Sequence, residues 1–107
     1  MARSIRLIYR NLQGRVRCNH NWDAITKRSA VLVTAAEWQQ QGFDPFDAEG
    51  RPHLGDANVY VTNIGPHDPE GGPGGVEFCV HVDWPAPLHV QVTITVFEPI
   101  EHWQVAG

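Results

Sequence analysis

The most regular feature of the chain is the alternation of apolar and polar residues in its C-terminal half. Residues 57–64, 76–84 and 88–97 all follow this pattern. A period of two is typical of half-buried β-strands, because successive side chains of a strand point to opposite faces of the sheet. The Gly- and Pro-rich segment 65–75 and the two prolines within residues 84–88 separate these runs. We therefore expect three consecutive antiparallel strands.

The N-terminal third continues the β pattern in shorter segments. Residues 4–10 alternate polar and apolar side chains, residues 15–19 form a second short run, and residues 30–34 are rich in valine. Valine and isoleucine favour strands because their branched side chains pack well on a pleated surface. Three further strands are therefore expected, which brings the total to about six.

A helical pattern occurs once, near residues 35–41. Thr34 and Glu37 have the spacing of a capping box, in which a hydroxyl and a carboxylate group satisfy free backbone amides at a helix start. Gly42 then stands where a left-handed residue commonly ends a helix. The pattern predicts one short helix.

Six strands and one short helix indicate an all-β fold, either an antiparallel sandwich or a partly closed barrel. The 107 residues are enough for one core, so the chain is interpreted as a single domain, 1–107. We expect the last two strands to pair as a hairpin with Trp84 opposite Leu88, and the N-terminal strands to cover the face of this sheet. The alternative is an α+β fold in which residues 23–41 form a longer helix packed on a sheet.

The start of the chain and its cysteines give expectations about the compartment. Arg3, Arg6 and Arg10 interrupt the apolar run that a signal peptide needs, and no segment is apolar over the roughly 20 residues of a membrane span. Cys18 and Cys79 lack the spacing of a disulfide or zinc motif, so both are expected to be reduced thiols. The sequence thus predicts a soluble, cytoplasmic protein without a membrane partner.

The formal net charge of −4 is divided unevenly along the chain. Residues 1–28 hold seven of the eight basic residues and one acid, a balance of +6, whereas residues 29–107 hold one basic residue and eleven acids, a balance of −10. A basic segment can bind phosphate backbones, so nucleic-acid binding through the N-terminal strands is one alternative function. Packing of a basic strand pair beside acidic neighbours is the favoured explanation, and charge-complementary self-association is a further alternative.

Three residues of the expected hairpin have the chemistry of a metal site. Counting outward from the turn places Asp83 opposite His89, with His81 on the same face. Two imidazoles and a carboxylate are typical ligands of catalytic zinc and of non-haem iron, so this cluster would hold one divalent metal. The residues that would support it are Cys79, Tyr60 and Gln91. The alternative function that follows is a small metal-dependent enzyme, whereas a solvated sheet face is the simpler interpretation.

Motifs of other catalytic classes are missing. The glycines of residues 71–75 are not followed by Lys-Ser or Lys-Thr, so they do not form a phosphate-binding loop, and neither Ser4 nor Ser29 lies in a nucleophile elbow. The acidic segment 45–56 has part of the spacing of a calcium loop, but Pro45 stands at its first ligand position. These absences argue against an enzyme.

The polar loops and their tryptophans indicate a binding function instead. An exposed indole beside Asn, Asp or Gln side chains can stack on a sugar ring or hold a protein partner. The candidate ligand-binding residues are Asn21, Trp22, Asp23, Tyr60, Gln91 and Trp103. We therefore expect a non-catalytic β-module that binds a polar small molecule or glycan, assembles into a homo-oligomer, or does both.

Overall fold

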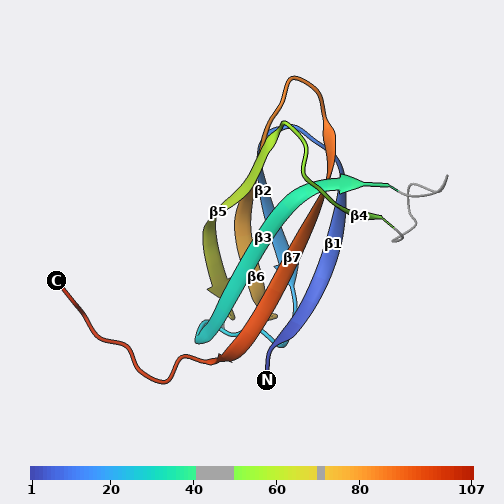
Figure 1. The fold of residues 1–107 in the computed structure, drawn as a ribbon. Helices are drawn as coiled ribbons and strands as arrows, with labels where there is room; N and C mark the ends of the chain where they lie inside the picture. The colour runs from blue at the N-terminus through green and yellow to red at the C-terminus, as the bar shows by residue number, and fades with distance from the viewer. Residues whose placement is uncertain (41–49, 70–71) are drawn as a thin grey trace.

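The chain folds into two antiparallel β-sheets that pack face to face (Figure 1). The computed structural model describes residues 1–40, 50–69 and 72–107. The four-stranded sheet has the order β1 (Arg3–Leu12), β7 (Leu88–Pro99), β3 (Ser29–Gln39) and β4 (Arg51–His53). The three-stranded sheet has the order β2 (Gly14–Asn21), β6 (Gly75–Asp83) and β5 (Asn58–His67). The all-β prediction is confirmed, with seven strands in the described residues where about six were expected.

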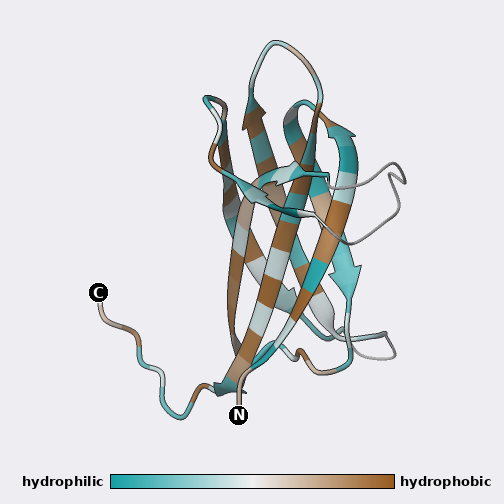
Figure 2. Ribbon diagram, turned by 45° about the vertical axis from the view of Figure 1, so that its right-hand side comes forward, coloured by the Kyte–Doolittle hydropathy of each residue, from teal (hydrophilic) through white to brown (hydrophobic). Residues whose placement is uncertain are grey.

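The core lies between the sheets and is built from alternate residues of the two central strands, β6 and β7. These inward residues, each at most 4% exposed, are Val76, Phe78, Val80, Val82, Val90, Val92, Ile94 and Val96. The hydropathy colouring of Figure 2 shows the same alternation as brown bands along the strands. Because burying one such side chain contributes roughly 1.5 to 3 kcal/mol, these two strands supply most of the apolar driving force for folding. The sequence pattern identified this core correctly.

The expected hairpin between β6 and β7 is wrong, because the two strands belong to different sheets. β6 pairs with β2 and β5, and β7 pairs with β1 and β3. The N-terminal strands therefore extend the two sheets side by side instead of covering one face. Alternation fixes which side of a strand is apolar but not which strand lies next to it. Crossing from one sheet to the other through residues 84–87 lets the two apolar sides face each other across the core.

The short helix is also wrong, because residues 35–39 continue strand β3. Ala35 pairs with Val92 and Glu37 with Val90, so this segment takes its backbone hydrogen bonds from the central strand β7. A capping box stabilises a helix only weakly, and a long antiparallel partner overrides that local preference. The described residues form no helix, which removes the α+β alternative. This part of the chain therefore also contains no helix that could cross a membrane. Position 41, the last of the predicted helix, lies outside the described residues.

The connection between β2 and β3 closes one end of the sandwich. Ile25 is fully buried although it lies in a turn, and its amide donates a hydrogen bond to the carbonyl oxygen of Trp22 at 2.9 Å. The Trp22 amide donates to the carbonyl oxygen of Gly74 at 2.8 Å, which joins the connection to the start of β6. A Cβ atom at Gly74 would overlap the carbonyl oxygen of Ile25, so this close approach requires glycine. The packing also fixes the backbone that carries Lys27.

Candidate polar-ligand site

The outer side of the three-stranded sheet carries a continuous set of polar side chains. Because alternate residues of its strands enter the core, the intervening residues point away from it. We call this set the outer polar face; it consists of Arg15, Arg17, Asn19, Tyr60, Thr62, Glu77, Cys79 and His81. The register groups these side chains in rows across the sheet: Arg15, His81 and Tyr60 form one row, and Arg17, Cys79 and Thr62 form the next.

A flat ring pair lies at one end of the outer polar face. The rings of Tyr60 and His81 are stacked, with centroids 4.5 Å apart and an interplanar angle of 1°. Thr62 Oγ1 lies 2.7 Å from His81 Nε2, within hydrogen-bonding distance, and holds the imidazole in this orientation. Tyr60 remains 43% exposed, so one aromatic surface stays accessible to a ligand.

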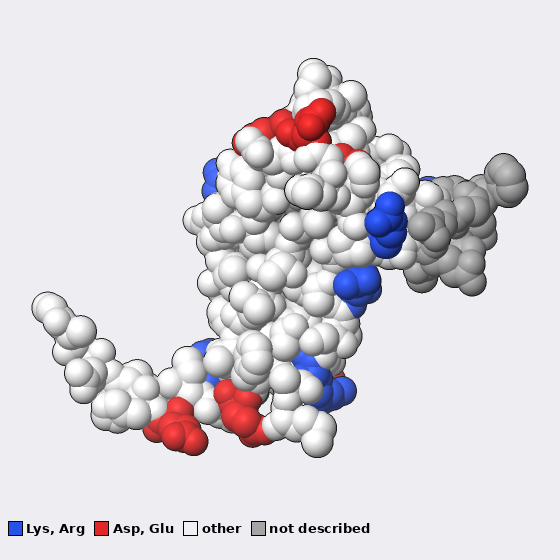
Figure 3. All heavy atoms as spheres, in the orientation of Figure 1, with Lys and Arg blue, Asp and Glu red and all other residues white. Residues whose placement is uncertain are grey.

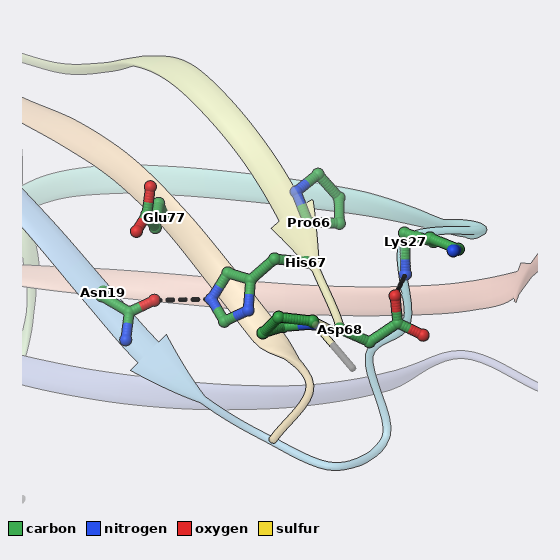
Figure 4. Close-up of a pocket in the computed structure, with 7 residues that line it drawn as sticks. Asn19, Lys27, Pro66, His67, Asp68 and Glu77 are labelled. Atoms are coloured by element: carbon green, nitrogen blue, oxygen red, sulfur yellow. Dashed lines mark hydrogen bonds between the residues drawn. The ribbon is translucent and has the colours of Figure 1, made fainter. Parts of the chain in front are cut away.

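The larger of two hollows beside this face lies between the ends of β2 and β5 (Figure 4). It has a volume of about 570 Å³ and is lined by Asn19, Lys27, Pro66, His67, Asp68, Pro69 and Glu77. His67 Nε2 lies 2.7 Å from Asn19 Oδ1, and the Lys27 amide donates to Asp68 Oδ1 at 3.1 Å. Since an amide oxygen only accepts hydrogen bonds, His67 donates from Nε2, and in the neutral tautomer with that hydrogen the other ring nitrogen, Nδ1, is an acceptor.

The position of His67 depends on an irregularity in β5. The register between β5 and β6 shifts between Thr62 and Gly65, and Asn63 has a positive φ of 58°. A bulge of this kind bends a strand and changes the direction of the side chains that follow it. It therefore sets the register that pairs His67 with Gly75, from which the His67 side chain reaches Asn19. Sequence analysis missed His67, because alternation alone gives no sign of where a bulge will occur.

A second hollow adjoins the first at Glu77, which lines both. Its volume is about 280 Å³, and its lining residues are Arg15, Arg17, Asn63, Glu77, Phe78 and Cys79. Arg17 Nη2 lies 3.2 Å from Glu77 Oε2, so a salt bridge stands where the two hollows meet. We call the two hollows together the Glu77 groove. It offers both hydrogen-bond donors and acceptors to a polar ligand.

The predicted ligand-binding residues are only partly brought together. Tyr60 belongs to the outer polar face, and Asn21 lies at its end, where its Oδ1 accepts a hydrogen bond from Asn19 Nδ2 at 3.0 Å. The other predicted residues lie elsewhere: Trp22 and Asp23 in the β2–β3 connection, Gln91 in the four-stranded sheet and Trp103 after β7. Gln91 is 4% exposed and accepts a hydrogen bond from the Thr93 hydroxyl at 2.7 Å. Sequence reasoning also missed Asn19 and Glu77 as site residues. The signal that could have found them is their place among the polar, outward positions of two alternating strands.

The predicted metal ligands do not converge. His81 and Asp83 lie on β6, whereas His89 lies on β7 in the other sheet, where its Nδ1 accepts a hydrogen bond from the Asn11 amide at 3.3 Å. Asp83 pairs across the sheet with Asn58. The metal hypothesis depended on a β6–β7 pairing that the structure does not contain. Among the described residues, no group of three or more His, Cys, Asp and Glu side chains could hold a metal ion. Residues 45–49 of the acidic loop lie outside the described part of the chain.

Both cysteines are free, as expected from their spacing. Cys18 lies in the core, and burial raises the pKa of its thiol above the ordinary value. Burial also raises the pKa of Tyr9, which packs against this core, to about 12. A protonated, enclosed thiol is a poor nucleophile, so Cys18 has the properties of a core residue.

The basic residues of the N-terminal segment do not form one stripe. Arg6 lies on the outer side of the four-stranded sheet, whereas Arg15 and Arg17 lie on the outer polar face. Three arginines stack over indole rings: Arg3 over Trp22 at 5.4 Å, Arg6 over Trp38 at 5.9 Å and Arg28 over Trp103 at 5.0 Å. On the face in Figure 3, the Lys and Arg atoms likewise form small groups separated by uncharged atoms. This arrangement does not favour a nucleic-acid interface.

A further hollow of about 420 Å³ lies near the opposite end of the sandwich. Its lining residues are Glu37, His53, Leu54, Gly55, Asp56, Trp84 and Leu88. His53 Nε2 and Glu37 Oε2 are 3.8 Å apart, so these two side chains can already pair with each other. The Glu77 groove is the stronger candidate because it is larger and continues along the outer polar face.

In comparisons with known proteins, no family model, no curated protein and no solved structure matches the chain.

Proposed function

We propose that the protein is a non-catalytic β-sandwich module that binds a polar, hydroxyl-rich ligand, such as a glycan, in the Glu77 groove. The observation that carries this proposal is the meeting of two hollows, about 570 and 280 Å³ in volume, at one carboxylate on the outer polar face. Ligand sites commonly have volumes of roughly 300 to 1,000 Å³ and combine apolar surface with a few placed polar groups.

The chemistry of the lining supports a sugar more than an apolar ligand. His67 Nδ1 and the Glu77 carboxylate can accept hydrogen bonds from hydroxyl groups, and the Lys27 ammonium can donate them. Pro66 and Pro69 add apolar surface against which the C–H side of a sugar ring can pack. The stacked rings of Tyr60 and His81 add a flat aromatic surface elsewhere on the outer polar face. These groups recognise and hold a ligand without requiring a reactive nucleophile.

A titration monitored by ¹⁵N–¹H correlation spectra tests the proposal. Neutral oligosaccharides, added one at a time, should shift the resonances of β2, β5 and β6 more than those of β1 and β3. Binding should weaken by up to about tenfold in His67→Ala, because one hydrogen bond contributes about 0.5 to 1.5 kcal/mol. His102→Ala is the matched control, since His102 is exposed in the tail after β7. A panel without any shift on β2, β5 or β6 would sink the proposal.

A second candidate, self-association, is favoured by the segment that follows β7. Residues 100–107 leave the body of the sandwich (Figure 1), and Ile100, Trp103 and Val105 are 45, 62 and 93% exposed. Exposed apolar side chains grouped on one segment are typical of contact surfaces. We propose that they contact a second copy of the chain. Sedimentation velocity should then show a dimer that Trp103→Ser dissociates, and a monomer at all concentrations would rule this candidate out.

A further inference from the structure

The two halves of the Glu77 groove differ in charge. Arg15 and Arg17 line the smaller hollow together with one acid, Glu77, so its formal balance is +1. Lys27 lines the larger hollow together with Asp68 and Glu77, so its formal balance is −1. A neutral ligand would make no use of this division. A ligand with one anionic group would be held with that group at the Arg15 end.

Arg15 is the cation available for such a group. Its side chain forms no hydrogen bond or ion pair with the described residues, whereas that of Arg17 is already paired with Glu77 at 3.2 Å. The two arginines are separated by one residue on the same strand, so their side chains leave the sheet on the same side, about 7 Å apart at their bases. Asp83, another acid of this side of β6, lies opposite Asn58 on β5 and makes no ion pair with Arg15.

The surroundings of Arg15 suit a carboxylate. A guanidinium group can donate two parallel hydrogen bonds to one carboxylate, which gives both affinity and a fixed orientation. Cys79 lines the same hollow and adds a small apolar surface, while the Asn63 side chain offers an additional donor. The hollow thus offers two guanidinium groups and a neighbouring amide to one anionic group of a ligand.

We infer that the ligand of the Glu77 groove is an acidic sugar whose carboxylate binds Arg15 and Arg17, with its neutral hydroxyl groups towards His67. This inference rests on the proposed function and adds the chemical class and the direction of the ligand. The salt bridge between Arg17 and Glu77 limits the charge that the groove can bind, because Glu77 neutralises one of the two arginines. The groove therefore accepts one carboxylate per ring rather than a multiply charged phosphate chain.

Matched pairs of probes test the inference: glucose against glucuronate, and galactose against galacturonate, each also as a short oligomer. We expect the acidic member of a pair to bind about tenfold tighter, as for hydrogen bonds to a charged group. Arg15→Gln should remove this preference, so that the acidic and neutral members of a pair bind the variant equally. Arg51→Gln is the control, because Arg51 is an exposed arginine on β4 in the other sheet. Thermal unfolding of both variants verifies that they are folded.

The outcomes separate the inference from the proposed function. If neutral sugars bind in the groove and acidic sugars bind no tighter, the inference is wrong and the proposed function stands. If Arg51→Gln loses the acidic preference as fully as Arg15→Gln does, the preference comes from overall charge, and the inference is wrong as well. If no neutral or acidic probe shifts the β2, β5 and β6 resonances, both are overturned. If Arg15→Gln loses the acidic preference and Arg51→Gln keeps it, the result supports both the inference and the proposed function.

Discussion

Ile25 links the core to the candidate site, so replacing it gives a direct test of the fold described above. Its side chain is fully buried in the core cluster although the residue lies outside every described strand. Replacing a buried isoleucine by alanine removes its apolar contacts and leaves a cavity, at a cost of about 2 to 5 kcal/mol. The backbone around Gly74 packs tightly against this turn and limits its collapse. We therefore expect Ile25→Ala to lose about 3 kcal/mol of unfolding free energy.

Urea unfolding followed by tryptophan fluorescence measures this loss. With a slope of about 1.5 kcal/mol per molar urea, a loss of about 3 kcal/mol lowers the midpoint by about 2 M. Leu54→Ala is the matched control because Leu54 is 98% exposed, and its unfolding free energy should change by less than about 0.5 kcal/mol. A loss of less than about 1 kcal/mol in Ile25→Ala would refute the conclusion that this turn residue belongs to the core.

Three further predictions follow from the packing and the pKa values. Gly74→Ala should lower the thermal unfolding temperature, because the new Cβ atom overlaps the carbonyl oxygen of Ile25; an unchanged temperature would contradict the close approach. The pKa of Tyr9 rises from 10.0 to about 12 on folding, so the unfolded chain ionises first, and stability should fall between pH 10 and 12. Tyr9→Phe should reduce that fall in melts at stepped pH, and an equal fall in both proteins would count against it. Iodoacetamide should alkylate Cys79, which lines the smaller hollow, before Cys18; mass spectra with Cys18 modified first would reverse this assignment.

The inward and outward sides of the strands could be predicted from the sequence because they depend on local alternation. Phe78, Val80 and Val92 are buried as the period of two requires. The same alternation extends through Arg15 and Arg17, which places both arginines on one outer side. These features need no knowledge of the neighbouring strand, so a single sequence suffices for them.

The pairing of the strands could not be predicted in the same way. A hairpin and a crossing between sheets bury the same residues of β6 and β7, so the pattern does not distinguish them. That ambiguity led to the wrong partner for His89, and with it to the metal hypothesis. Similarly, Thr34 and Glu37 carry a helix signal that is satisfied locally, whereas the strand that replaces it depends on hydrogen bonds to a distant segment. The bulge after Thr62 that governs the position of His67 is non-local in the same sense.

The two outer sides of the sandwich differ in a way that explains why we place the candidate site on the three-stranded sheet. On the four-stranded sheet, polar groups are paired with one another: Ser4 Oγ lies 2.8 Å from Thr95 Oγ1, and the Thr93 hydroxyl donates to Gln91. Groups that already have partners gain little from a ligand, because each new hydrogen bond replaces an existing one. On the three-stranded sheet, Arg15 and the second nitrogen of His67 retain free hydrogen-bonding capacity beside a hollow. A ligand gains most where such groups converge, and that place is the Glu77 groove.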